Sequence, residues 1–436
     1  MKLHQIKLCL LLLSLPLLLS ACASGGGQDW DEHTLVFADV SGHGVDREAM
    51  NRFNREHEDM QIEVRDYSDE DGLDRLRTEI MAGKVPDIIE LNALPYRLLI
   101  QQGYLENLWP YIESDPELGR EAVMEAPLKA AEVDGGLYSV FREVLINTLV
   151  GAERVVGDRY GWTTEDLLAA FETMPAGSTI TDYYATKSTM FGLLCPMNLD
   201  SYVNWETGEC SFDAESFRNT LQFVNSFPDE VDHPIDRPDE ELRERRQEGL
   251  QMLWMIPTYS PDDVQIYDLM FGEKTTFIGY PTGDGSVGSS FFPSNMFAMS
   301  STCRNKEAAW DYLRETLLPN YTRNTMKDAV SLRSVRLPVN RADYDLQVKV
   351  LMDTRDNRAI RGLAGLDDDG LPPMTEEEVA RFQDFYDHID KIDRCDQNVY
   401  DIVWEQCGAY FAGDKSLDET IELIQRRVKL YVNEMR

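Results

Sequence analysis

Two kinds of hydrophobic spacing alternate near the start of the chain, and their order restricts the fold more than any other feature. Thr34–Asp39, Gln61–Tyr67 and Pro86–Leu91 carry the short apolar runs or the alternation typical of β-strands. The two stretches between them repeat apolar residues at helical spacing, and Gly83 is placed to end the second helix. A strand–helix–strand–helix–strand order implies right-handed crossovers, so the sequence predicts an α/β fold containing a parallel sheet.

The carboxyl ends of these strands are the first place to expect a binding site, because ligands of open α/β sheets bind beyond those ends. The sequence places Asp39–His43, Asp66–Ser68 and Asn92 there. His43 is the only histidine beside this predicted cleft. We therefore expect ligand contacts in these three loops.

The last hundred residues have the pattern of helices. Thr375 with Glu378, and Ser416 with Glu419, each fit a capping box. Apolar stripes at helical spacing follow both boxes. The Gly- and Asp-rich stretch Arg355–Pro373 is predicted to be a long loop.

Charge excludes one large class of function. The chain has 78 acidic and 42 basic residues, and its formal net charge is −36. Binding of nucleic acid needs a basic face that displaces counterions from phosphates. The densest basic cluster, Arg243–Arg246, lies among glutamates. We therefore expect no nucleic-acid partner.

The first thirty residues are predicted to direct and anchor the protein. Lys2 and Lys7 precede an apolar run that is too short for a permanent membrane span and ends in Leu19-Ser20-Ala21-Cys22. Small residues before a cysteine resemble the bacterial lipobox. This predicts a signal peptide over 1–21, acylation of Cys22, a flexible tether over 22–30, and a membrane anchor at the extracellular face of the cell. The alternative is an ordinary cleaved signal with a chance cysteine.

Motifs for a cofactor or a metal fail in their sequence context. Gly283–Gly288 matches a dinucleotide fingerprint, but the chain that follows has the pattern of an extended segment where a helix is required. Asp367–Gly370 lacks the carboxylate that a calcium loop needs at its first position. We expect no cofactor and no metal site. Cys195 and Cys210 could form a disulfide or remain buried thiols.

Seven segments, in order along the chain, carry a family resemblance. The most specific is Trp205–Phe212, which reads WETGECSF and is similar to the family pattern DWETGECSFD. The other six are Gly83–Ile89, Asp134–Val140, Gly161–Leu167, Asn305–Trp310, Leu337–Asn340 and Leu430–Glu434. Together they resemble the carbohydrate-type (family 1) extracellular solute-binding proteins of ABC importers, in the lipoprotein subfamily of Gram-positive bacteria. Two departures are Phe141-Arg142, where a proline usually follows the tyrosine at 138, and the 355–373 insertion.

The resemblance implies a two-lobed periplasmic-binding-protein-like fold of type II. Each lobe would be a mostly parallel sheet flanked by helices, with residues 31–141 and 293–335 in the N-terminal lobe and residues 142–292 and 336–436 in the C-terminal lobe. Three crossings between the lobes are expected near Ser139–Val144, Ser289–Phe297 and Val335–Asn340. It also implies a monomeric, non-enzymatic receptor that delivers a carbohydrate, most simply an oligosaccharide, to permease subunits.

Sugar binding sets the residue types to look for in such a cleft. Aromatic side chains cover the apolar faces of pyranose rings, and polar side chains bond the hydroxyls. The predicted contacts are the residues of these types at strand ends and crossings: Ser41, Tyr67, Asn92, Tyr138, Arg142, Trp254, Tyr259, Phe291 and Trp404. Trp205 is predicted to lie on a surface hairpin and to contact no ligand.

Two alternatives remain open at this point. A binding protein for a cationic or peptide solute would fit the acidity, and a cleft with many carboxylates and few aromatic residues would favour it. A surface glycosidase needs two carboxyl groups that flank a sugar, and their separation in space cannot be obtained from their spacing in the chain.

Overall fold

The computed structural model describes residues 33–91, 94–181, 186–230, 239–255, 257–320, 336–355, 370–393 and 395–435. The predicted signal peptide, Cys22, the tether and Asn92 lie outside the described residues, as does most of the predicted 355–373 loop. Among the described residues, no helix is long and apolar enough to cross a membrane.

The parallel sheet predicted near the start of the chain is confirmed. Its strands are β1 (Thr34–Asp39), β2 (Gln61–Asp66), β3 (Ile88–Glu90) and β11 (Phe297–Met299), in the order β11-β3-β1-β2. The first strand pairs in parallel with β2 and β3, whereas β11 is antiparallel to β3. The crossovers are α1 (Arg47–Glu56) and α2 (Gly72–Met81). Asp46 begins α1 by accepting hydrogen bonds from the backbone N–H groups of Glu48 and Ala49, both at 3.0 Å.

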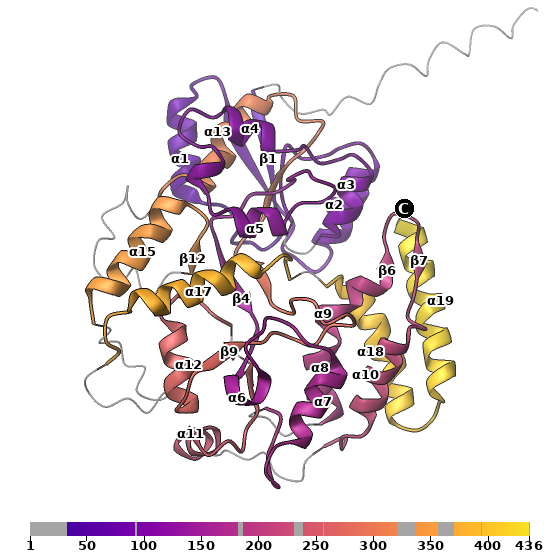
Figure 1. Ribbon diagram of the computed structural model, residues 1–436. Coiled ribbons are helices and arrows are strands. Elements are labelled where there is room, and N and C mark those ends of the chain that lie inside the picture. The colour runs from indigo at the N-terminus through magenta and orange to yellow at the C-terminus, as the bar shows by residue number, and fades with distance from the viewer. Residues whose placement is uncertain are drawn as a thin grey trace, which may run out of the picture.

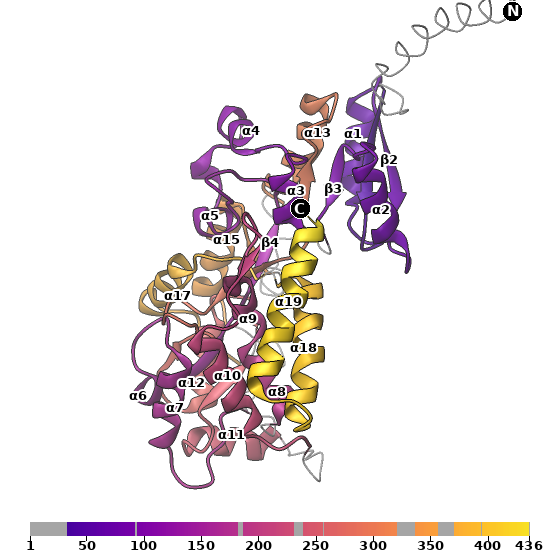
Figure 2. The same ribbon diagram turned by 90° about the vertical axis from the view of Figure 1, so that its right-hand side faces the viewer.

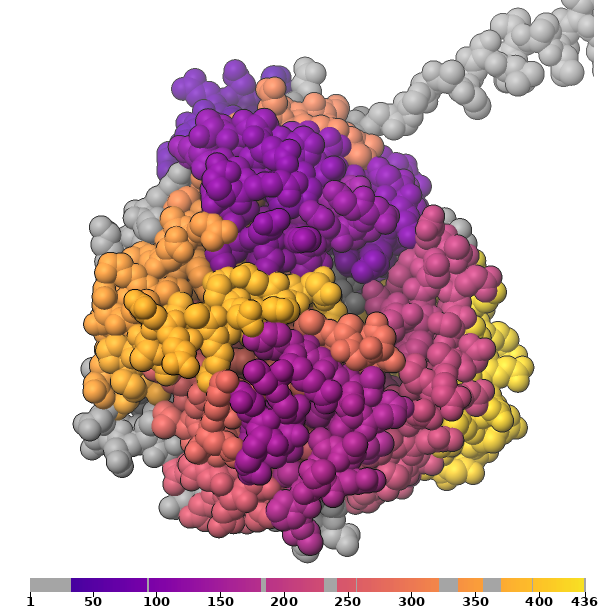
Figure 3. Space-filling model, in the orientation of Figure 1, coloured from indigo at the N-terminus to yellow at the C-terminus, as the bar shows by residue number. Residues whose placement is uncertain are grey.

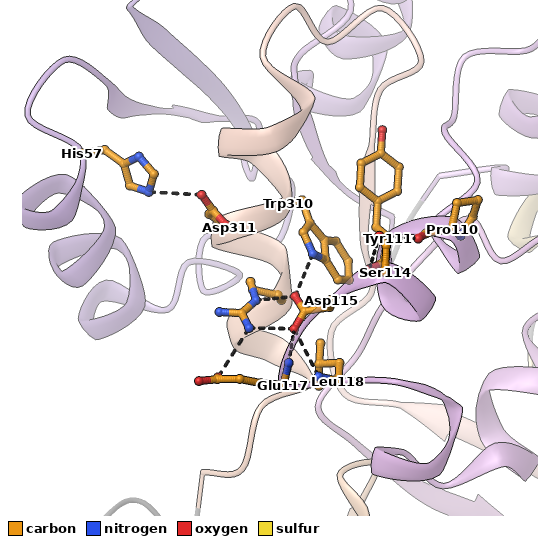
Figure 4. Close-up of polar contacts among 10 residues, drawn as sticks. His57, Pro110, Tyr111, Ser114, Asp115, Glu117, Leu118, Trp310 and Asp311 are labelled. Atoms are coloured by element: carbon orange, nitrogen blue, oxygen red, sulfur yellow. Dashed lines mark hydrogen bonds and ion pairs between the residues drawn. The ribbon is translucent and has the colours of Figure 1, made fainter.

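Helices complete this upper half of the molecule (Figure 1). They are α3 (Tyr96–Gln101), α4 (Trp109–Ser114), α5 (Glu125–Ala130) and α13 (Lys306–Leu313). Asp115, directly after α4, joins this region to the distant segment of α13 (Figure 4). Its carboxylate accepts two hydrogen bonds from the Arg314 guanidinium, at 2.6 and 2.8 Å, and one from the Trp310 indole at 3.1 Å.

A second sheet gathers segments of all three predicted crossings. Its strands are β4 (Glu143–Asn147), β10 (Ser290–Pro293) and β12 (Leu337–Pro338), in the antiparallel order β10-β4-β12. Three segments that are far apart along the chain therefore pair in one sheet.

The third sheet corrects the expectation of a mostly parallel sheet in each lobe. Its strands are β5 (Leu149–Ala152), β8 (Leu253–Met255) and β9 (Thr275–Phe277), and β5 lies between the other two. Both neighbours are antiparallel to β5, so β8 and β9 run in the same direction. The helix α12 (Asp263–Phe271) joins β8 to β9, which run in the same direction. Between them lies β5, which runs the opposite way and follows β4 directly along the chain.

The remaining elements lie beside and below this region, and α18 and α19 lie side by side along one flank (Figure 2). The helices are α6 (Glu153–Val156), α7 (Thr164–Glu172), α8 (Lys187–Leu194), α9 (Pro196–Leu199), α10 (Glu215–Asn225), α11 (Asp239–Gln247), α15 (Arg341–Asp353), α17 (Glu376–His388), α18 (Gln397–Phe411) and α19 (Leu417–Met435). The short hairpin β6 (Val203–Asn204) and β7 (Glu209–Cys210) lies against α19. Both predicted capping boxes are present, before α17 and at the start of α19.

Two apolar cores hold these elements together. The first contains the β1–β3 sheet and continues through β4 into α12 and α17. The second packs the β6–β7 hairpin among α8, α10, α18 and α19. Cys195 and Cys210 are both free thiols in the second core, so of the two alternatives for this pair the structure shows buried thiols. Burial raises the pKa of the Cys210 thiol to about 11.

Candidate binding cleft

Two cavities lie where the α2 and α3 region meets the helices and hairpin of the second core. The α18 cavity, of 690 Å³, is lined by α2 and the start of α3 on one side and by residues around the start of α18 on the other. The hairpin cavity, of 880 Å³, is lined mainly by the β6–β7 hairpin, α9 and the 282–286 turn. Figure 3 shows the surface hollowed where the upper half meets the segment that contains β6 and β7.

Four residues line both cavities and so form a shared wall: Arg97, Asp200, Trp205 and Asp393. Arg97, on α3, forms an ion pair with Asp200 at 3.3 Å. The Trp205 indole donates a hydrogen bond to the other oxygen of the same carboxylate at 2.8 Å. Burial raises the pKa of Asp200, although Arg97 and the indole act in the opposite direction. The shared wall is therefore a polar bridge between α3 and the hairpin region.

A second contact strengthens this bridge. The side-chain amide of Gln101, at the end of α3, reaches the backbone of the hairpin, with its nitrogen 3.1 Å from the carbonyl oxygen of Trp205 and its oxygen 3.2 Å from the N–H of Glu206. The exposed turn of α3 therefore contacts the hairpin through both a charged and a neutral side chain.

Aromatic surface faces the α18 cavity from three elements. Phe292 on β10 leaves 42% of its surface exposed, although it lies among the large apolar residues of a strand. Trp205 is half-buried at the shared wall, and Tyr96 contributes the edge of a largely buried ring. Exposed aromatic surface inside a concave site suits a ligand with apolar faces.

Hydrogen-bonding groups surround these rings. Asp393 accepts a hydrogen bond from the Asn147 amide of β4, and burial raises the pKa of the Asp393 carboxyl. Asp396 caps α18 through the backbone N–H groups of Asn398 and Val399 and accepts a hydrogen bond from the Tyr431 hydroxyl at 3.1 Å. The α18 cavity therefore combines carboxylates, amides and aromatic faces.

The hairpin cavity is more polar. Lys391 lines it close to Asp284 and Asp393, and burial lowers the pKa of the lysine. Asp284 closes its own turn by accepting hydrogen bonds from the backbone N–H of Ser286 at 3.0 Å and from the Thr282 hydroxyl at 3.2 Å. Among the described residues, no group of His, Cys, Asp and Glu side chains could hold a metal ion.

Three of the predicted ligand contacts are buried in the structure. Phe291 is fully buried against Tyr386, with ring centroids 4.9 Å apart, because strand alternation turns it into the core and its neighbour Phe292 outward. Tyr67 is 3% exposed and donates to Glu79 at 2.7 Å. Trp254 is 8% exposed and covered by the guanidinium of Arg246 at 3.8 Å. These side chains offer a ligand little or no surface.

The other predicted contacts lie outside both cavities. Ser41 and Tyr259 are exposed, and Trp404, which is 37% exposed, packs its ring 4.9 Å from that of the buried Phe191. Tyr138 is half-buried, and Arg142 pairs with Asp46 at 3.1 Å. None of these five side chains lines either cavity. Asn92 lies outside the described residues.

Residues close in sequence to three of the predicted contacts line the α18 cavity. Glu70, Leu94 and Phe292 line the α18 cavity within three positions of Tyr67, Asn92 and Phe291. The hairpin residue Trp205, to which we assigned no ligand, is at the shared wall. The alternation of a strand could have shown that Phe291 and Phe292 lie on opposite faces. Nothing in the local sequence indicates that α3 faces the hairpin.

Comparison with known proteins identifies the family. A family model described as bacterial extracellular solute-binding protein matches residues 48–344. No curated protein matches the chain. An oligogalacturonide-binding protein from Yersinia enterocolitica is 14% identical, with a TM-score of 0.52 over 92% of this chain and 100% of that chain, and shows the same α/β fold.

Two further solved structures match at lower scores. They are an ABC substrate-binding protein from Listeria monocytogenes in complex with cycloalternan and a sugar-binding protein from Xanthomonas citri. These are 15% and 14% identical, and each matches 92% of this chain and 98% of its own, with a TM-score of 0.49. The matched residues make up more than half of the chain, so it is a solute-binding component of an ABC importer and not an enzyme. The chain belongs to the bacterial extracellular solute-binding protein family.

Proposed function

We propose that the protein captures an oligosaccharide in the cleft formed by the two cavities and delivers it to the permease subunits of an ABC transporter. The observation that carries this proposal is the pair of cavities that meet at one shared wall. Each has a volume within the range of ~300–1,000 Å³ that is typical of sites for drug-sized ligands. A solute that extends through both is therefore longer than one sugar ring.

The lining supplies both kinds of contact that a sugar needs. Phe292 and Trp205 offer aromatic faces to pyranose rings. Asp393, Gln397 and Asn398 offer oxygens and amides to sugar hydroxyls. Solved proteins of this fold include sugar receptors, but at 12–15% identity they support the fold rather than a particular solute.

Solute capture would close the cleft by bending the β10-β4-β12 sheet. We place residues 31–141 and 293–335 in one lobe, and residues 142–292 and 336–436 in the other. A solute that touches both walls binds the closed form better and shifts the population toward it. The permease would then distinguish the closed receptor from the open one.

We also propose that acylation of Cys22 anchors a monomeric receptor at the outer face of the cell membrane. The support is the small-residue run before Cys22 and the glycine-rich segment after it. Cys22→Ala should yield a protein that is not acylated and is not retained in membrane fractions. Equal retention of the variant and the wild type would contradict the anchor.

A cationic or peptide solute is the second candidate, favoured by the carboxylates in the cleft. Glu70, Asp74, Asp200, Asp393 and Asp396 all line the α18 cavity. A thermal-shift screen of neutral oligosaccharides, uronate oligomers and cationic peptides, followed by calorimetry, separates the candidates. A ligand at 100 times its dissociation constant adds about 2.7 kcal/mol to stability. Stabilisation by cationic peptides and by no carbohydrate would overturn the sugar proposal.

A further inference from the structure

The charges that line the cleft are unbalanced. Five carboxylates and two guanidinium groups line the α18 cavity. Six carboxylates, one guanidinium and one ammonium group line the hairpin cavity. Asp200 and Asp393 belong to both sets, so a solute that spans the two cavities passes both carboxylates.

The cations of the lining already have carboxylate partners. Arg97 pairs with Asp200 at 3.3 Å, and Arg77 with Asp74 at 3.4 Å. Lys391 is largely buried and interacts electrostatically with Asp284, Asp390 and Asp393. An anionic group on a solute would have to compete with these carboxylates for every cation that lines the cleft.

The carboxylates outnumber these cations in both cavities. Lys429, which lies outside the lining, pairs with Glu209 at 2.7 Å, and Asp393 also accepts a hydrogen bond from the neutral amide of Asn147. Glu70 is exposed at the start of α2 and faces the α18 cavity. An ionised carboxylate only accepts hydrogen bonds, so this lining calls for donors on the solute. Sugar hydroxyls and protonated amines are donors, whereas a uronate, sulfate or phosphate group is a further acceptor that carries the same charge as the lining.

We propose that the cleft selects neutral or amino sugars and excludes oligosaccharides that bear carboxylate, sulfate or phosphate groups. This inference rests on the proposed function and adds the charge class of its solute. Like charges repel more strongly in a concave site that is partly shielded from water than they do in bulk solvent, so the exclusion acts at short range within the cleft.

The test begins with the neutral oligosaccharide that binds best in the screen. Its primary alcohols are oxidised to carboxylates, and a portion of that product is converted to the methyl ester. Oxidised and esterified forms have the same sugar rings and linkages; the ester adds a methyl group at each carboxyl and removes its charge. By calorimetry at low salt, the carboxylate form should bind at least about tenfold more weakly than the ester. This difference in affinity should become smaller as salt is added.

Variants locate the cause of the discrimination. Asp393→Asn removes a charge at the shared wall and keeps an oxygen that can accept a hydrogen bond from Asn147. The difference in affinity between the carboxylate form and the ester should therefore become smaller. Glu70→Gln, at an exposed position in the same cavity, should act in the same direction, and it tests the idea if Asp393→Asn does not fold. Glu422→Gln removes one charge from the exposed side of α19 and is the matched control, which should leave the difference in affinity unchanged.

The outcomes separate this inference from the proposed function. A carboxylate form that binds as tightly as the ester, or a uronate oligomer that binds when neutral sugars do not, would overturn the charge class while leaving a sugar receptor in place. If Glu422→Gln reduces the affinity difference between carboxylate form and ester as much as Asp393→Asn does, the inference is also overturned, because the overall charge of the protein would then explain the reduction. Binding of cationic peptides and of no sugar of any charge would overturn the proposed function itself.

Discussion

The two walls of the cleft are held in place by different means. On the α2 and α3 side, buried carboxylates fix β1 and the loop after it. Glu90 accepts from the backbone N–H groups of Val40 and Ser41 at 2.9 and 3.0 Å, and Asp87 from that of Val36 at 2.9 Å. A wall that is tied to the backbone of a sheet in this way resists displacement.

The opposite wall depends on side chains of a helix. The hairpin that carries Trp205 is held to α19 by Lys429 with Glu209 at 2.7 Å, by Asn433 with the carbonyl oxygen of Gly208 at 3.2 Å, and by Gln425 with the N–H of Phe212 at 2.9 Å. Contacts between long side chains are more easily rearranged than a buried sheet. We therefore expect the hairpin wall to adjust to the solute and the sheet wall to stay fixed.

The largest expected effects on stability come from truncating one buried phenylalanine in each core. Phe212 is fully buried in the second core, 5.6 Å from the ring of Tyr202 and 5.2 Å from that of Phe217. Phe212→Ala should lower the free energy of unfolding by about 3–5 kcal/mol. Hydrogen exchange should accelerate in the hairpin, α10 and α19 while the β1–β3 sheet keeps its protection.

The matched variant lies in the first core. Phe37 on β1 is fully buried, with its ring 5.7 Å from Phe297 and 6.0 Å from Tyr312. Phe37→Ala should lower the free energy of unfolding by a similar amount. It should accelerate hydrogen exchange in the β1–β3 sheet and not in the hairpin, α10 and α19. If both variants raise exchange equally in both regions, the cores unfold as one unit and the contrast between the walls loses its basis.

The ion pair behind the sheet wall gives the next largest effect. Burial alone would raise the pKa of Asp115, but hydrogen bonds from Arg314, the N–H of Glu117 and Trp310 outweigh it and hold that pKa at about 2. A folded-state pKa of about 2, below the ordinary aspartate value of 3.8, corresponds to about 2 kcal/mol of stability. This contribution is present above pH 3.8 and is lost as the pH falls toward 2.

Asp115→Asn should remove this contribution, so the free energy of unfolding of the variant should fall less steeply than that of the wild type as the pH is lowered. The measurement is denaturant unfolding at a series of pH values for wild type and variant. Their difference in stability should shrink as the pH falls below 4. A difference that stays constant with pH would show that packing, rather than charge, accounts for the role of Asp115.

The sheet wall could be predicted because its signals are local. Thr34–Asp39 and the strands after it show their period within a few residues, and the parallel order follows from the helices between them. In the third sheet, β5 lies between β8 and β9, which follow it by a hundred residues or more. No local pattern encodes that insertion, so the expectation of a second parallel sheet was wrong.

The same distinction explains the site. The loops after β2 and β3 were expected to line a cleft, and residues near their ends do so. Strand alternation places Phe291 and Phe292 on opposite faces, but which of them faces the cavity depends on the pairing of β10 with β4. The place of Trp205 at the shared wall could not be predicted, because it depends on α3 reaching the hairpin, a contact between residues about a hundred positions apart.

Trp205 gives a direct test of the cleft. Trp205→Ala should weaken solute binding by about 1–2 kcal/mol, because an aromatic face and the hydrogen bond to Asp200 are both lost. Calorimetry with the best ligand of the screen measures the loss. Trp404→Ala, which truncates a tryptophan outside both cavities, is the control and should leave affinity unchanged. A larger loss of affinity in Trp404→Ala than in Trp205→Ala would place the site at Trp404, outside both cavities.

The smallest expected effect is the most informative about motion of the walls. Arg97 and Asp200 are 44% and 30% exposed, so their ion pair is worth ~0.2–1 kcal/mol and is screened by salt. Arg97→Gln should therefore shift solute-free molecules toward the open form without changing the free energy of unfolding by more than that amount. Fluorescence energy transfer between dyes on α1 and α10 measures the distribution of distances.

The control for that shift is Arg65→Gln, which breaks an exposed pair with Glu63 on the sheet wall alone. This variant should leave the distances unchanged. Wild-type protein in 1 M salt should resemble Arg97→Gln, because the same ion pair is screened. If neither the variant nor salt moves the distances, Gln101 and packing at the β10-β4-β12 sheet hold the walls together, and the charged bridge serves only to orient Asp200 toward the indole of Trp205.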